Sequence, residues 1–223
     1  MTPYDRLCAE TAPARYRFLG IPLVQQAAAR GGSRALYLDF LTQAYHHVKH
    51  TFPLLSLAAA LTRDERYQDA LFEYMKEERG HDKWILDDIR ALGGNAEKVT
   101  NGKPDMACEI MVGHGYYAIE HISPYAILGM VHVLEGLSIM LAHTVATAVK
   151  DSLKTQGNAG FSYLISHGSL DIEHVTLFKN LVNGFEDPKT VDIIIDAARV
   201  FYHLYGTIFA DMGNRHAEVS HAA

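Results

Sequence analysis

The chain has 223 residues and a formal net charge of −6, and its only cysteines are Cys8 and Cys108. This length fits one domain with one well-buried core, and an acidic chain without a run of Lys or Arg excludes nucleic acid as its main partner. Two cysteines without a Cys-x-x-Cys pair exclude a disulfide framework and a thiolate metal site, and no signal-peptide pattern follows Met1, so we expect a cytoplasmic protein.

Helical periodicity dominates the chain, and no convincing alternation of Val, Ile and Thr indicates strands. We therefore predict an all-α fold of about seven helical segments in one bundle-like domain over residues 1–223. In chain order the segments cover 2–30 with an interruption at Gly20 and Pro22, 34–61 with a kink or a restart at Pro53, 62–92, 105–121, 124–154, 161–185 and 188–213. A short flexible tail is expected from about residue 214.

The most membrane-like stretch lies between Glu120 and Lys150, where Glu135 is the only formally charged residue. A charge in the middle of a membrane span costs about 2.5–3.5 kcal/mol on insertion scales, and the rest of the chain has an ordinary amphipathic pattern. We therefore predict a buried central helix and no membrane partner.

Glu135 stands in this apolar helix with nothing nearby in the sequence to neutralise it. Burying an ionised carboxylate without a partner costs several kcal/mol even after relaxation, so something must compensate it. A bound metal ion is the favoured compensation, because other helices offer matching ligands. A protonated Glu135, or a salt bridge to an Arg or Lys distant in sequence, stays open as an alternative.

The most informative motif is His167-x-x-x-Asp171-x-x-His174, inside the segment 161–185. On a helix these three residues fall within an arc of about 60°. Two imidazoles and a carboxylate on one narrow stripe can converge on one or two cations, and without thiolates they suit iron or manganese better than structural zinc. By itself the triplet is also consistent with a solvated or hydrogen-bonded helix face.

A second pair, Glu78-x-x-His81, repeats the i, i+3 spacing of Asp171 and His174. Dimetal carboxylate bundles take an acid-x-x-His pair from each of two helices and a lone carboxylate from each of two others. Here Glu135 supplies one lone carboxylate, and His167 stands where the other would be. Glu77 is a rival to Glu78, because its i, i+4 spacing to His81 is also compatible with a shared site.

These motifs, together with the stretch from Tyr45 to Pro53 and Leu134-Glu135-Gly136, resemble the haem-oxygenase-like dimetal oxidases and oxygenases, often called iron-containing redox enzymes. The resemblance covers nearly the whole chain and implies a haem-oxygenase-like (TenA-like) multihelical bundle. It implies two iron ions, or a manganese–iron pair, and no haem. The implied ligands are Glu78, His81, Glu135, His167, Asp171 and His174.

The resemblance further implies an enzyme that activates dioxygen to oxidise a small organic substrate such as a fatty acid, an amino acid or an amine. Related proteins are commonly dimers, so a homodimer is expected. Phe52, Tyr117 and Tyr125 are candidate residues of the substrate pocket, and His47 and His121 are candidates for hydrogen bonds to the ligands or the substrate. Structural histidines with satisfied hydrogen bonds are the alternative for the last two.

The same fold hosts other activities, so the fold alone does not decide the function. A metal-free thiaminase II (TenA)-like hydrolase needs a cysteine nucleophile, but this chain has Pro124-Tyr125 where that family carries Pro-Cys. A haem oxygenase needs an axial His in its first helix, but here no His precedes His46. A non-catalytic metal-binding or regulatory protein of the same fold stays open.

Overall fold

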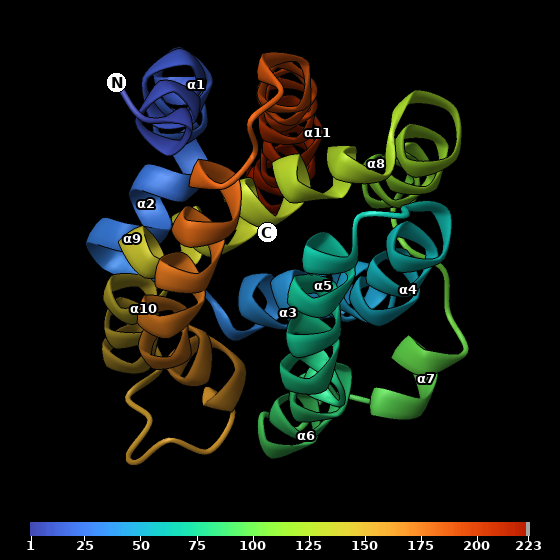
Figure 1. Cartoon of the computed structure of the whole chain (residues 1–223). Coiled ribbons are helices and arrows are strands. Elements are labelled where there is room, and N and C mark those ends of the chain that lie inside the picture. The colour runs from blue at the N-terminus through green and yellow to red at the C-terminus, as the bar shows by residue number, and fades with distance from the viewer. Residues whose placement is uncertain (222–223) are drawn as a thin grey trace.

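The computed structural model describes the backbone of residues 1–221 and the side chains of residues 1–166 and 175–218 (Figure 1). This part of the chain is helical and contains no strand, which confirms the all-α prediction. Its elements are α1 (Pro3–Leu19), α2 (Pro22–Arg30), α3 (Arg34–Val48), α4 (Thr51–Leu61), α5 (Glu65–Glu78), α6 (His81–Ala91), α7 (Ala96–Thr100), α8 (Met106–Tyr117), the π-helical turn η1 (Ala118–Ile122), the 3-10 turn η2 (Pro124–Ala126), α9 (Ile127–Leu153), α10 (Ser162–Asn183) and α11 (Pro188–His221).

The described chain has more helices than the seven predicted, because several predicted segments are divided. The segment 34–61 breaks at Lys49 and His50 and restarts at Thr51, so of the two alternatives at Pro53 the restart is the one observed. Pro53 lies in the first turn of α4, where a missing N–H leaves no hydrogen bond unmade within the helix. The segment 62–92 breaks at Arg79 and Gly80, and the linker after residue 92 holds the short helix α7.

The last helix is longer than predicted. It continues to His221, past Gly213, where the predicted segment ends. Two side chains of this final part bind the same carboxylate on α3: Arg215 Nη2 lies 3.0 Å and His216 Nε2 lies 2.9 Å from Asp39 Oδ2. These contacts hold the end of α11 against the bundle.

Helix α9 lies at the centre of the fold, as predicted for segment 124–154. It packs against α10, α11 and α2, and Figure 1 shows α9 and α10 side by side. The two helices α9 and α11 lie close together at Gly129, where an added Cβ would lie 2.5 Å from the backbone N of Ala198. Residues Pro124–Leu153 and Pro188–Glu218 are both long and apolar enough to cross a membrane, but 56% of the most apolar window in the first is buried inside the protein.

The buried side chains among the described residues form two hydrophobic cores. The larger core includes Leu71 and Tyr74 of α5 and the first part of α9 up to Leu137. The smaller core lies between α3, α6 and the start of α10, and it takes in α9 from Ala142 onwards. Helix α9 therefore passes from one core to the other between Leu137 and Ala142, while α5 and α6 belong to different cores.

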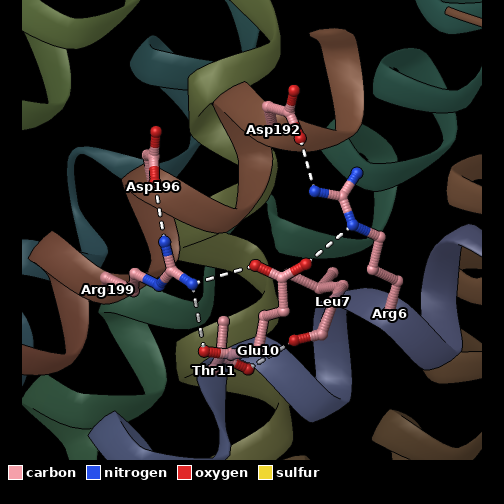
Figure 2. A network of polar contacts seen from close by, with 7 residues as sticks. All are labelled: Arg6, Leu7, Glu10, Thr11, Asp192, Asp196 and Arg199. Carbon is pink, nitrogen blue, oxygen red and sulfur yellow. Dashed lines mark hydrogen bonds and ion pairs between the residues drawn. The ribbon is translucent and has the colours of Figure 1, made fainter. Parts of the chain in front are cut away.

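A network of ion pairs joins the two terminal helices α1 and α11 (Figure 2). Arg6 binds Glu10 at 2.7 Å and Asp192 at 2.6 Å. Arg199 binds the other oxygen of Glu10 at 3.0 Å and Asp196 at 3.0 Å. These side chains are more than a third exposed, so the network orients the two helices and adds little to stability.

Candidate metal centre

A cavity of about 170 Å³ lies inside the bundle, between α2, α3, α5, α9, α10 and α11. Most of the described side chains that line it are aliphatic or aromatic. The acidic residues among them are Glu78, at the end of α5, and Glu135, near the middle of α9. Two carboxylates from separate helices thus face the same apolar space.

The position of Glu135 follows from the packing of α9. Its neighbours Val133 and Leu137 are buried in the larger core, which fixes the face that α9 turns toward the cavity. The Oε2 atom of Glu135 is buried, and the carboxylate lines the cavity. The sequence-based expectation of a carboxylate held inside the protein is therefore met at this residue, and its charge requires compensation.

Glu78 and His81 come together across a break in the helix. The single helix predicted over 62–92 is wrong at this point, because α5 ends at Glu78 and α6 begins at His81. Gly80 adopts a φ of +101°, a conformation that residues with a Cβ rarely take, and this ends the helical path. The turn still brings Glu78 Oε2 to 3.2 Å from His81 Nδ1.

Both partners of this pair are shielded from solvent. The His81 side chain is 3% exposed and that of Glu78 is 12% exposed. The His81 ring stacks on Trp84 with 4.3 Å between the ring centroids, which fixes the plane of the imidazole. Glu77, in contrast, is exposed and does not line the cavity. Of the two rival glutamates, the geometry favours Glu78 as the residue that shares a site with Glu135.

His47, which was predicted to donate hydrogen bonds to the ligands or the substrate, also lies at the cavity. It is 2% exposed, lines the same space as Glu78 and Glu135, and its ring meets that of Tyr205 edge-on at 5.7 Å. Its neighbour His46 points elsewhere, because its Nδ1 contacts Lys49 Nζ at 3.3 Å and it does not line the cavity.

The side chains of His167, Asp171 and His174 lie outside the described residues. The backbone there belongs to α10, so the predicted helix is confirmed, and α10 packs along α9, which carries Glu135. The described part of the predicted ligand set is Glu78, His81 and Glu135. No group of three His, Cys, Asp or Glu among the described side chains is close enough to hold a metal ion.

The four remaining predicted pocket residues do not line this cavity. Phe52 and Tyr117 are 42% and 55% exposed, and His121 lies on η1 with its ring 5.0 Å from that of Tyr117. Tyr125 donates to Asp64 Oδ2 at 3.1 Å and stacks on Tyr67 at 4.6 Å. These residues lie along η1, η2 and the exposed sides of α4 and α8, away from the carboxylates.

Four tyrosines that the sequence did not single out line the cavity: Tyr37, Tyr74, Tyr163 and Tyr205. Burial raises the pKa of Tyr205, so this phenol keeps its proton over the physiological range. Tyr74 and Glu78 are four residues apart on α5 and therefore lie on one face of the helix. This spacing is the sequence signal from which Tyr74 could have been predicted to line the cavity.

Comparison with known proteins decides the family. A model for iron-containing redox enzymes matches residues 38–206, which is most of the chain and includes all six predicted ligands. The chain belongs to this family. No protein of curated function matches the sequence.

Solved structures similar to this iron-containing redox enzyme share its fold at low identity. A domain of unknown function with a heme oxygenase-like fold from Shewanella denitrificans is 21% identical with a TM-score of 0.88, over 99% of this chain and 96% of that one. Heme oxygenase-1 from Synechocystis, solved with heme, is 12% identical with a TM-score of 0.76, over 99% and 96%. A TenA homolog from Pseudomonas syringae is 14% identical with a TM-score of 0.73, over 93% and 91%. The haem-oxygenase-like, TenA-like fold is thereby confirmed.

Proposed function

We propose that this protein is a non-haem dimetal oxidase or oxygenase, which uses two iron ions, or manganese and iron, to oxidise a small organic substrate with dioxygen. The observation that carries the proposal is that Glu78 and Glu135, from different helices, line one otherwise apolar cavity. Two buried carboxylates that face the same space repel each other unless cations lie between them. Membership of an iron-containing family supports iron as the metal.

The proposed ligands are Glu78, His81, Glu135, His167, Asp171 and His174. Carboxylates supply the negative charge that stabilises the oxidised ions, and neutral imidazoles complete the coordination shell. Glu78 also orients the His81 ring, as acidic neighbours do for metal-bound histidines. When bound, the two ions supply electrons to dioxygen. The apolar walls exclude water from the reacting groups, and Tyr74 and His47 offer polar atoms at the edge of the same space.

The proposal takes the metal site to be free of haem. The acidic and imidazole side chains at this site, Glu78, His81 and Glu135, are ligands that suit iron or manganese ions bound directly by the protein. Helix α1 also contains no His to serve as an axial ligand.

The two cysteines argue against a thiaminase-like hydrolase. Neither lines the cavity in the described structure. Burial, together with the nearby Asp105, raises the pKa of the Cys108 thiol to about 12, so it carries almost no nucleophilic thiolate at neutral pH.

The same proposal includes a homodimer in the cytoplasm. The long helices α9 and α11 expose apolar side chains that a second copy would cover, with Ile139 39%, Met140 47% and Val200 38% exposed. Light scattering on purified protein tests this point, and a monomer at micromolar concentration would contradict it.

Metal analysis tests the proposed function. We expect protein loaded anaerobically with ferrous iron and then desalted to retain two irons per chain and to consume dioxygen. Glu135→Gln removes a ligand charge and should retain at least about tenfold less iron, as removal of metal-site partners does. Glu120→Gln, on the exposed surface of η1, is the matched control and should retain the metal. Wild-type protein that retains neither iron nor manganese would contradict the proposal.

A further inference from the structure

Trp84 is the only tryptophan of the chain, and it connects the candidate metal centre with the protein surface. Its ring stacks on that of His81, with 4.3 Å between the centroids and 29° between the planes. This is a close contact, since the centroids of interacting aromatic rings usually lie about 4.5–7 Å apart. Trp84 is also 36% exposed, whereas His81 is buried. One indole therefore touches a proposed ligand and the solvent.

The buried tyrosines of the cavity do not make such a connection. Tyr37 and Tyr74 are 3% and 1% exposed. The Tyr37 hydroxyl donates to the carbonyl oxygen of Gly160 at 3.1 Å, and burial raises its pKa. A phenol loses an electron readily only when a base takes its proton, and a carbonyl oxygen is a very weak base. An indole can lose an electron and keep its proton, so Trp84 is better suited than Tyr37 to pass single electrons to and from solvent.

Reduction of dioxygen at the proposed site requires electrons from outside the cavity. Conversion of dioxygen to water takes four electrons and four protons, and two ferrous ions supply two of these electrons. Electrons that the organic substrate does not supply, and those that return the ferric ions to the ferrous state, come from a reductant in solution, and the protons come from water. Because most of the described cavity walls are apolar, entry of a charged reductant is costly. Electrons therefore need a path through the protein.

We propose that Trp84 relays single electrons from a reductant at the protein surface to the oxidised metal site, through the ring of His81. In each transfer the indole loses one electron to the site and regains one from the reductant, so no bond of the indole forms or breaks. The reductant is a one-electron donor, and ascorbate is a small soluble probe of this class. This role rests on the proposed function, because it requires a redox-active ion bound at His81.

Two substitutions at one position separate electron transfer from packing. Trp84→Phe keeps an aromatic ring beside His81 but is not oxidised, whereas Trp84→Tyr offers an oxidisable ring at the same exposed position. With iron-loaded protein, dioxygen and no organic substrate, Trp84→Phe should oxidise ascorbate at least about tenfold more slowly than the wild type, a loss typical for partners of metal ligands. Trp84→Tyr should recover most of the rate.

Tyr16→Phe is the matched control, because it removes an oxidisable ring from a residue of α1 that is 68% exposed, and it should leave the rate unchanged. Circular dichroism and metal analysis verify that each variant folds and holds iron, and rates are compared per bound iron. A wild-type rate in Trp84→Phe, or equal losses in Trp84→Phe and Trp84→Tyr, would overturn the proposal.

The wild-type protein provides a second test that needs no variant. Without ascorbate the oxidised indole is not reduced again and takes up oxygen from dioxygen. Peptide mass spectrometry should therefore find added oxygen on Trp84 after iron-loaded protein meets dioxygen, and should find much less when ascorbate is present or the protein holds no metal. Added oxygen on Tyr37 or Tyr74 with none on Trp84 would overturn the proposal.

Fluorescence tests the contact between Trp84 and the site in the absence of turnover. The emission reports on this one residue, because the chain has no other tryptophan. Without dioxygen, bound ferrous iron should lower the emission more than an equal amount of bound zinc, which has no redox chemistry. Equal losses with the two metals would contradict electron transfer between the indole and the site.

Protein that retains iron and consumes dioxygen, but keeps the wild-type rate in Trp84→Phe and gains no oxygen on Trp84, contradicts the relay and leaves the dimetal site. Protein that retains neither iron nor manganese contradicts both proposals.

Discussion

Glu78 Oε2 lies 3.2 Å from His81 Nδ1 although the helix is interrupted between the two residues. An unbroken helix brings residues i and i+3 together by its periodicity alone. Here the contact depends on the turn at Arg79 and Gly80. The backbone conformation of this turn therefore sets the relative position of two proposed ligands.

The first prediction concerns the turn at Arg79 and Gly80. Gly80→Ala forces a residue with a Cβ into a φ of +101°, so we expect a loss of about 1–2 kcal/mol of stability and weaker iron retention. Urea unfolding and metal analysis measure the two effects. Gly113→Ala is the control, because Gly113 lies within α8 with open space around its Cβ position and should gain about 0.5–1 kcal/mol. Equal effects of the two substitutions would show that the Gly80 conformation is unimportant.

The second prediction separates the neighbouring glutamates. Glu78→Gln should lower iron retention at least about tenfold, whereas Glu77→Gln should leave it unchanged, because Glu78 lines the cavity and Glu77 is exposed. Both variants remove one charge from the same turn of α5, so each controls for the other. Loss of iron in Glu77→Gln alone would reverse the assignment.

The third prediction concerns the crossing of α9 and α11. At Gly129 an added Cβ would lie 2.5 Å from the Ala198 backbone N and 2.7 Å from the Ala197 Cβ. Gly129→Ala should therefore push the helices apart and cost roughly 1–3 kcal/mol, as overpacked substitutions do. Gly136→Ala, on the same helix with nothing within 4 Å, is the control and should not destabilise the protein. Thermal unfolding of both variants measures the difference.

The fourth prediction is a dependence of stability on pH. Burial lowers the pKa of His132 from 6.5 to about 4, and its Nε2 lies 3.0 Å from Thr11 Oγ1. Between these two pKa values the unfolded chain binds the proton and the folded chain does not, so stability falls as pH drops from about 6.5 to 4, by up to about 3 kcal/mol from this residue. Above pH 6.5 the residue contributes no dependence.

Urea unfolding at pH 7 and pH 4.5 checks this sign. His132→Leu should show a smaller loss of stability between the two pH values than the wild type, whatever its stability at pH 7. His203→Leu, on the exposed side of α11, should keep the wild-type loss. If His132→Leu keeps the wild-type pH dependence, the loss of stability at low pH arises from other groups and the prediction is wrong.

Local sequence signals were sufficient for the fold class and for the central helix. Pro124 marks the start of the last turn before α9, and the charge-free run around Glu135 predicts a buried helix, as observed. The same signals failed at Gly80, because the charged run from Lys76 to Lys83 continues the helical pattern on both sides, and a single Gly within such a pattern is a weak stop signal. The packing of α5 and α6 in different cores explains the break between them, and this packing is not visible in the sequence.

The orientation of the aromatic side chains could not be predicted for a related reason. Helices α4 and α8, which carry Phe52 and Tyr117, have apolar residues on every side, so periodicity does not identify the buried face. Contacts with neighbouring helices decide it, and those contacts are not encoded in the spacing of residues along one helix. Glu135 was predictable because a lone charge in an apolar helix has few stable environments.

Because the described interior is divided into two cores, the Glu78 and His81 pair connects two separately packed parts of the protein. Each residue is attached to a different half of the protein, and Glu135 stands just before α9 crosses between those halves. An ion held jointly by these three side chains would fasten the halves to one another, so that loading the protein would change its cooperativity of unfolding as well as its chemistry.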